Sequence, residues 1–174
     1  FDPKDILYFR IDRKKKLPIT TFLFALGLKR EKILENFYTY SNYNFNKKSN
    51  SWYTNFDPNN YKRPIKLAFN LMDKKNDKIV LKKGEKLNFV LAAKLKEKGL
   101  EEITVSDEEL LGKYTKDNIE DQNGEQILKS GYDIDNESLE KIKSSEVKVL
   151  RLANVDTILR GPYIFETIKI DKNN

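Results

Sequence analysis

An internal repeat constrains the fold of this chain more than any other feature of its sequence. The segment Asp77–Gly84 aligns with Gly124–Gly131 at an offset of 47 residues, and Leu81, Lys82 and Gly84 recur identically. Each copy is predicted to run strand, glycine turn, amphipathic helix, returning strand, short connector and further strand. A duplicated unit of this kind buries its apolar faces in a small mixed module, so the repeat predicts an α+β architecture.

The repeat units are expected at about 64–120 and 121–171. In the first copy Asn88 is a candidate N-cap for a helix through Lys98, and in the second copy Asp135 is a candidate N-cap for a helix through about Lys143. Returning strands are expected at 103–105 and 147–152. A second set of matches, at an offset of 49, pairs Gly112, Tyr114 and Ile119 with Gly161, Tyr163 and Ile168.

The first forty residues are predicted to form a strand followed by two short helices. Residues 6–11 are β-branched and aromatic enough for a strand, and the basic run 13–16 follows as a turn. Pro18 suits the first turn of a helix through 26, and apolar spacings of three and four predict a second helix at 33–38. The expected core of this part is Phe22, Leu23, Leu26, Ile33, Leu34 and Phe37.

Residues 41–63 are rich in Ser, Asn and Tyr and show no clear apolar period, so they are predicted to be a long loop with short extended pieces. The segment contains several aromatic side chains, which could form a base-stacking platform or could pack down to hold the loop on its domain. Packing is the favoured interpretation. These aromatic residues are Tyr43, Phe45, Trp52, Tyr53 and Phe56.

The absence of His and Cys excludes several chemistries. A catalytic triad, a thiol nucleophile, a disulfide and an ordinary zinc site all need an imidazole or a thiolate, and the 174 residues contain neither. The longest mostly apolar stretch, residues 17–28, is too short to span a bilayer, which predicts no membrane association. The chain begins with Phe1 and shows no leader pattern, so it is expected to be a piece of a longer protein.

The positive charge is concentrated in the first part of the chain. Residues 1–70 contain 14 Lys and Arg against 6 Asp and Glu, whereas residues 71–174 contain 19 against 21. A basic segment joined to a near-neutral remainder predicts one surface that faces a polyanion. The densest cluster runs from Arg10 to Lys16.

The two ends of the chain resemble the lobe (β2) region of the β subunit of bacterial DNA-directed RNA polymerase. The resemblance lies in Phe1–Asp5, in the run Arg10–Pro18 (Arg-Ile-Asp-Arg-Lys-Lys-Lys-Leu-Pro) and in the closing Gly161–Ile164. It implies that 1–40 and 156–174 are the lobe-like part and that 41–155 is a lineage-specific insertion. The implied fold is a lobe fragment, with a strand and short helices, carrying a pair of repeated small α/β modules.

The resemblance also implies a function in transcription. The parent enzyme is a nucleotidyltransferase whose magnesium lies on another subunit, so this fragment is expected to hold no catalytic residue, metal or cofactor. The lobe forms a wall of the cleft for downstream DNA and the non-template strand, and the insertion is a candidate docking surface for transcription factors. Implied partners are DNA and the β′, α, ω and sigma subunits, in the cytoplasm and with the nucleoid. The candidate DNA-binding residues are Arg10, Asp12, Arg13, Lys14 and Lys15.

Within that motif the residue types suggest different roles. Lys14 and Lys15 stand where family members have Arg, which keeps the charge but loses the bidentate fork. Lysine suits sequence-independent phosphate contact better than base recognition. Asp12 would repel phosphate, so it is expected either to hold Arg10 or Arg13 in place or to accept a hydrogen bond from a base, and the first role is favoured.

An alternative of a different class is a free-standing basic nucleic-acid-binding module without enzymatic activity. The two hypotheses differ in the reading frame, which the polymerase hypothesis expects to continue beyond both Phe1 and Asn174. A start codon just before Phe1 and a stop after Asn174 would favour the free-standing module.

Overall fold

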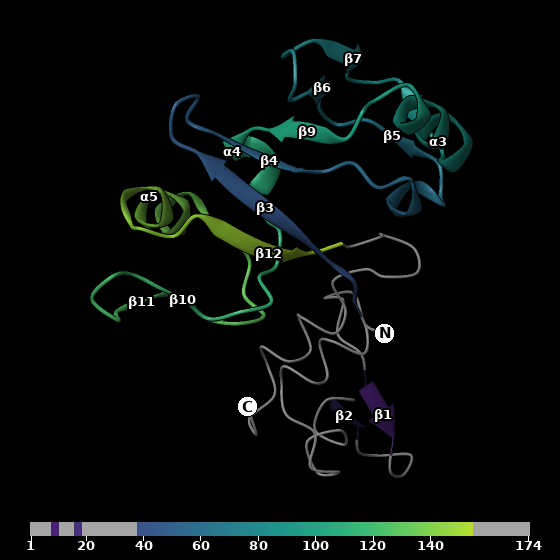
Figure 1. Ribbon diagram of the computed structural model, residues 1–174. Helices are drawn as coiled ribbons and strands as arrows, with labels where there is room; N and C mark the ends of the chain where they lie inside the picture. Colours follow the sequence, from purple (N-terminus) through teal and green to yellow (C-terminus); the bar gives the residue numbers. More distant parts are fainter. Residues whose placement is uncertain (1–7, 11–15, 19–37, 155–174) are drawn as a thin grey trace. The chain divides into compact units, whose positions relative to one another are not determined.

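The computed structural model describes residues 8–10, 16–18 and 38–154, and Figure 1 shows their mixed α/β arrangement. The largest sheet has six antiparallel strands in the order β12-β3-β4-β9-β6-β7, and three two-stranded sheets pair β1 with β2, β5 with β8 and β10 with β11. The expected α+β class is confirmed at this level. In chain order the elements are β1 (Tyr8–Arg10), β2 (Lys16–Pro18), β3 (Tyr40–Asn46), β4 (Ser51–Asn55), the 3-10 helix η1 (Pro58–Tyr61), β5 (Ile65–Lys66), β6 (Leu71–Asp73), β7 (Ile79–Leu81), β8 (Lys86–Leu87), α3 (Phe89–Glu97), β9 (Glu102–Val105), α4 (Asp107–Leu110), β10 (Ile119–Glu120), β11 (Gln126–Leu128), α5 (Asn136–Ser144) and β12 (Val149–Ala153).

The segment predicted to be a long loop instead supplies two inner strands of the large sheet. β3 and β4 form an antiparallel hairpin in which Phe45 lies opposite Trp52. Along β4 the buried residues Trp52 and Thr54 alternate with more exposed ones, which is the period of a half-buried strand. The prediction was wrong because Thr, Ser and Asn occupy so many positions that this short alternation does not stand out as an apolar pattern.

Three of the five aromatic residues that could form a base-stacking platform are buried, whereas Phe45 and Tyr53 are half-buried. Trp52 and Phe56 are fully buried, and Tyr43 is nearly so. The Phe45 ring lies 4.8 Å from the Trp52 ring, centroid to centroid. The packing interpretation is therefore confirmed for Tyr43, Trp52 and Phe56, because the fold covers the faces that base stacking would need.

The chain divides into two compact units, each with its own buried residues. The first comprises Ser41–Leu111 with Lys148–Leu150, and the second includes 112–147 and 151–154 among its described residues. The core of the first unit gathers Phe56, Leu67, Leu71, Leu87, Ala92 and Leu100. Buried apolar residues of the second unit include Ile119, Ile134, Leu139, Ile142, Leu152 and Ala153.

Both predicted helices of the repeat are present with their predicted caps. The Asn88 side chain accepts a hydrogen bond from the Leu91 amide at the start of α3. The Asp135 side chain accepts one from the Ser138 amide at the start of α5, and the Ser138 hydroxyl accepts one in return from the Asp135 amide. These side chains satisfy amides that a helix start would otherwise leave without partners.

The two segments that contain these helices share further details, at offsets of 47 residues for the glycines and 48 residues for the carbonyls that they contact. The Gly84 amide donates to the Leu67 carbonyl at 2.8 Å, and the Gly131 amide donates to the Thr115 carbonyl at 2.8 Å. Both glycines have positive φ, 93° and 84°, which a residue with a side chain rarely adopts. A hairpin precedes each glycine: β6–β7 in one segment and β10–β11 in the other. The second hairpin pairs Ile119 and Glu120 with β11.

In the first forty residues, β1 is antiparallel to β2, and Tyr8 lies opposite Pro18. Pro18 therefore ends a strand and does not begin a helix. Proline lacks the amide hydrogen that an inner strand must donate, but a two-stranded sheet has only edges and accepts it. Residues 19–37, which hold most of both predicted helices and all of their core residues, and the matches at Gly161, Tyr163 and Ile168 lie outside the described residues. Tyr38, the last residue of the helix predicted at 33–38, is described and is not helical.

Among the described residues, every helix is too short or too polar to traverse a lipid bilayer.

Candidate nucleic-acid interface

The structure describes one residue of the candidate DNA-binding motif. Arg10 is the last residue of β1 and lies opposite Lys16, the first residue of β2. Asp12, Arg13, Lys14 and Lys15 fall between these two paired positions in the sequence and lie outside the described residues. The pairing brings the two ends of the basic run to adjacent positions of one antiparallel sheet.

Outside this motif, a partly buried polar contact of the first unit lies at helix α4. The buried Trp52 ring donates through Nε1 to Asp107 Oδ1 at 3.1 Å. Burial, followed by the charge of Glu109, raises the pKa of the Tyr61 phenol. Burial likewise raises the pKa of Tyr43, with Tyr61 and Glu109 adding to the effect. Both phenols therefore stay protonated over the physiological range, which suits a structural role and not a catalytic base.

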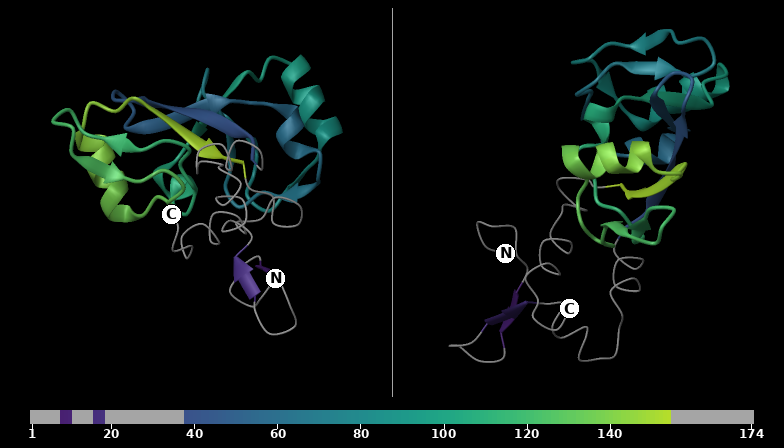
Figure 2. Two further views of the ribbon diagram at one scale, coloured as in Figure 1. Left: turned by 90° about the horizontal axis from the view of Figure 1, so that it is seen from below. Right: turned by 90° about the vertical axis from the view of Figure 1, so that its left-hand side faces the viewer.

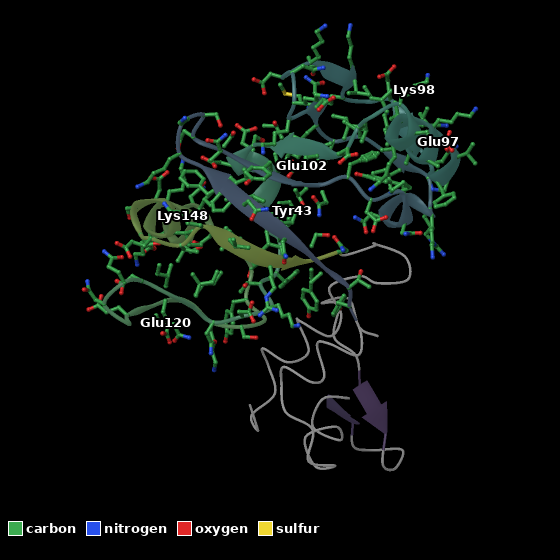
Figure 3. The ribbon with its side chains drawn as sticks, viewed as in Figure 1. Tyr43, Glu97, Lys98, Glu102, Glu120 and Lys148 are labelled. Atoms are coloured by element: carbon green, nitrogen blue, oxygen red, sulfur yellow. The ribbon has the colours of Figure 1, made fainter. Side chains whose placement is uncertain are left out.

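The hollows of the first unit are lined by polar side chains. One, of about 490 Å³, is lined by Asn55, Phe56, Asp57, Lys96, Glu101 and Glu102. Lys96 Nζ donates to the Phe56 carbonyl at 3.1 Å. Figure 3 shows Glu97 and Lys98 at the end of α3 and Glu102 on the neighbouring strand β9. Within the described ranges, no group of three or more Asp and Glu side chains is arranged to hold a metal ion.

Several surface charges of the described residues are neutralised inside the chain. Arg151 donates two hydrogen bonds to Asp117, through Nε and through Nη2, each of 2.6 Å. Lys74 Nζ lies 3.6 Å from the centroid of the Tyr53 ring and 3.6 Å from Glu102 Oε1. These cations already have partners, so they are poor candidates for contact with an external anion.

Sequence reasoning missed the link between Trp52 and Asp107. The two residues are separated by 55 positions, and β4 and β9 bring them together by placing Trp52 opposite Val105. The available signal was the Ser106–Glu109 pattern, a capping box that marks a helix start next to Asp107. The capping box gives the position of helix α4, but it does not reveal that Trp52 on β4 is the partner of Asp107.

Comparison with curated proteins finds relatives over almost the whole chain, although no protein-family model matches it. The chain is 34% identical over 174 residues to the DNA-directed RNA polymerase subunit beta of Caulobacter vibrioides. It is 36% identical over 174 residues to the proteins of the same name from Rhizobium leguminosarum bv. trifolii and Ehrlichia canis.

Each of these alignments covers 99% of the chain but only 12–13% of the relative. The alignments therefore include the basic motif, both compact units and the closing segment. This chain is a homologue of one segment of the β subunit of bacterial DNA-directed RNA polymerase.

Proposed function

We propose that this chain is the lobe segment of an RNA polymerase β subunit and that it forms a wall of the cleft for downstream DNA and the non-template strand. The observation that carries the proposal is the alignment of 99% of the chain with β subunits at 34–36% identity. The parent enzyme would be a nucleotidyltransferase that acts with β′, α, ω and sigma subunits in the cytoplasm and at the nucleoid. Its magnesium would be held by another subunit.

In this proposal the basic run contacts the phosphate backbone. Arg10, Arg13, Lys14 and Lys15 supply the positive charge, and Asp12 orients a neighbouring arginine. The register that pairs Arg10 with Lys16 supports the proposal, because it brings both ends of the run together. Contacts of this kind bind without regard to sequence, as a cleft wall must when DNA moves past it.

The region 41–155 is proposed to be an insertion built from two copies of one module. The support is the recurrence of the capped helix, the glycine turn and the preceding hairpin at offsets of 47–48 residues. In this proposal the second module begins before β10, since β10 pairs with β11. The proposed role of the insertion is to dock transcription factors.

Salt dependence tests the DNA contact. Replacing Arg13, Lys14 and Lys15 with Ala in the assembled polymerase should shorten the lifetime of open complexes at low salt. It should also reduce the slope of log lifetime against log salt by about 2–3, because each lost phosphate contact removes nearly one released counterion. The measurement is the decay of open complexes over a series of salt concentrations.

A matched control removes three exposed lysines of the inserted region, Lys47, Lys98 and Lys129, which changes the net charge by the same amount. This control variant should keep the wild-type slope. If the motif variant also kept it, residues 13–15 would not contact the nucleic acid.

A further inference from the structure

Among the described residues, the outer edge of β7 is an open edge of the six-stranded sheet. β7 is the last strand in the sheet order, and in that part of the chain it pairs with β6 alone. Figure 1 and the right-hand view of Figure 2 both show it as the outermost strand. Ile79, at its start, is 49% exposed, which is unusual for a large β-branched residue. An edge of this kind presents backbone donors and acceptors to any strand laid beside it.

The hairpin that carries this edge is strongly basic. Residues 71–86 contain six lysines against three acidic residues. Lys74 already contacts Tyr53 and Glu102, but the other five lysines are exposed, and in the described part of the chain none of them forms an ion pair. These five are Lys75, Lys78, Lys82, Lys83 and Lys86. We call them, together with Ile79, the β7 edge surface.

The hairpin β10–β11 gives an internal comparison. It lies at the equivalent position of the other segment and is followed by the same glycine turn. Its residues 119–133 contain one lysine against four acidic residues. Because the same backbone arrangement forms with the opposite charge, the fold does not require the lysines of the β7 edge surface.

The chemistry of this surface fits a polypeptide better than a nucleic acid. Residues 71–86 contain no arginine and no aromatic residue, the types that fork onto phosphate or stack on bases. An open strand edge is complementary to an extended peptide backbone, and the exposed Ile79 can pack against one of its apolar side chains. The lysines that flank this edge select a partner of negative charge.

We propose that the β7 edge surface binds an extended, acidic polypeptide segment, which adds to the sheet as a strand beside Ile79–Leu81. The partner's backbone would pair with β7, and its Asp or Glu side chains would meet Lys78, Lys82 and Lys83. This inference deepens the proposed docking role of the inserted region and rests on it. It names the surface and the charge of the partner.

A competing explanation is that the lysines only prevent edge-to-edge aggregation, since charged residues commonly protect exposed strands. Lysines repel another basic edge but attract an acidic one. If protection were their only role, an acidic strand would not bind beside β7. Strand addition instead predicts binding that depends both on the charge of the lysines and on the backbone amides of the peptide.

The test uses the whole 174-residue chain and a fluorescein-labelled peptide of alternating Glu and Val residues, with binding followed by fluorescence anisotropy. A second peptide has the same sequence with alternate backbone amides N-methylated, which keeps the charge but removes the hydrogen-bond donors. The variant Lys78→Glu/Lys82→Glu/Lys83→Glu is compared with Lys129→Glu, the exposed lysine equivalent to Lys82 in the acidic hairpin. Circular dichroism checks that each variant is folded, and the triple Lys→Gln variant replaces the first if it is not.

The unmodified peptide should bind. N-methylation should weaken binding about tenfold, the triple variant should weaken it by at least about tenfold, and Lys129→Glu should leave it unchanged. Absence of binding would overturn the proposal, as would equal binding of the two peptides or equal loss in Lys129→Glu. Competition by an oligo-dT strand that depends on the same three lysines would identify a nucleic-acid site instead. Because residues 13–15 are untouched, failure here leaves the open-complex experiment to judge the proposed function separately.

Discussion

At the scale of single residues, Asp135 is an exposed side chain with a defined structural task. Hydrogen bonds from the Ser138 amide and hydroxyl hold the pKa of its carboxyl below its usual value. A carboxyl with a depressed pKa stabilises the fold above the pKa of the unfolded chain, about 3.8, and this contribution is lost as the pH falls through the folded value. The Asp135 cap therefore acts at neutral pH and is lost in acid.

Replacing Asp135 with Ala should lower the free energy of unfolding at pH 7 by about 0.5–2 kcal/mol, because the amides at the start of α5 lose their acceptor. Urea unfolding followed by circular dichroism at pH 7 and at pH 3 measures the effect. Asp135→Asn is the control, since Asn is also a good cap. A loss of stability that stays the same at pH 3 would show that the charge of Asp135 does not contribute.

The buried hydrogen bond of Trp52 gives a second residue-scale prediction. Asp107→Ala leaves the indole N–H of a fully buried ring without this acceptor and should cost about 1–3 kcal/mol of unfolding free energy. Asp107→Asn retains an acceptor oxygen and should cost less. The chain has a single Trp, so its fluorescence reports unfolding directly. Equal costs for the two variants would mean that this bond contributes little.

At the scale of elements, the sequence predicted the features that depend on residues close together in the chain, such as helix caps. Asn88 and Asp135 were recognisable as caps because a cap and its amide partner lie three residues apart. The strands β3 and β4 were not recognisable, because their burial depends on β9 and β12, which follow far along the sequence. Pro18 was misassigned because proline is equally suited to a first helical turn and to the end of an edge strand.

The candidate DNA site shows the same difference between local sequence signals and pairing with other strands. Its residue types could be read directly from a basic run and a family motif. The pairing of Arg10 with Lys16 needed the register between two strands, which no local pattern specifies. The β7 edge surface was likewise invisible in the sequence, since a run of lysines does not reveal which strand has no neighbour.

The glycine turn gives a prediction at the element scale. Gly84 has φ of +93°, so Gly84→Ala should cost about 1–2 kcal/mol of unfolding free energy even though the space around it is open. The neighbouring change Lys83→Ala, at a residue without positive φ, is the control. If Gly84→Ala were as stable as Lys83→Ala in urea unfolding, the turn would not depend on the left-handed conformation.

At the scale of the whole molecule, the charge of the chain is divided by element as well as by region. The motif at 10–16 is basic, and the two equivalent hairpins carry opposite charge. The net charge of residues 71–174 is therefore near zero although this region contains one basic hairpin and one acidic hairpin. Under the proposals above, one protein would use its cationic surfaces for different partners: nucleic acid at the motif and polypeptide at β7.

The large sheet also joins distant parts of the chain, because β3, which begins at Tyr40, lies beside β12, which ends at Ala153. Just outside these strands, the Asn154 amide donates to the Thr39 carbonyl at 2.9 Å. The region between them thus leaves and returns at nearly the same point, and closing the gap costs little chain entropy. Such a region can be removed as one unit: under the proposed function, we expect that joining Thr39 to Asn154 through a Gly-Gly link leaves polymerase assembly intact.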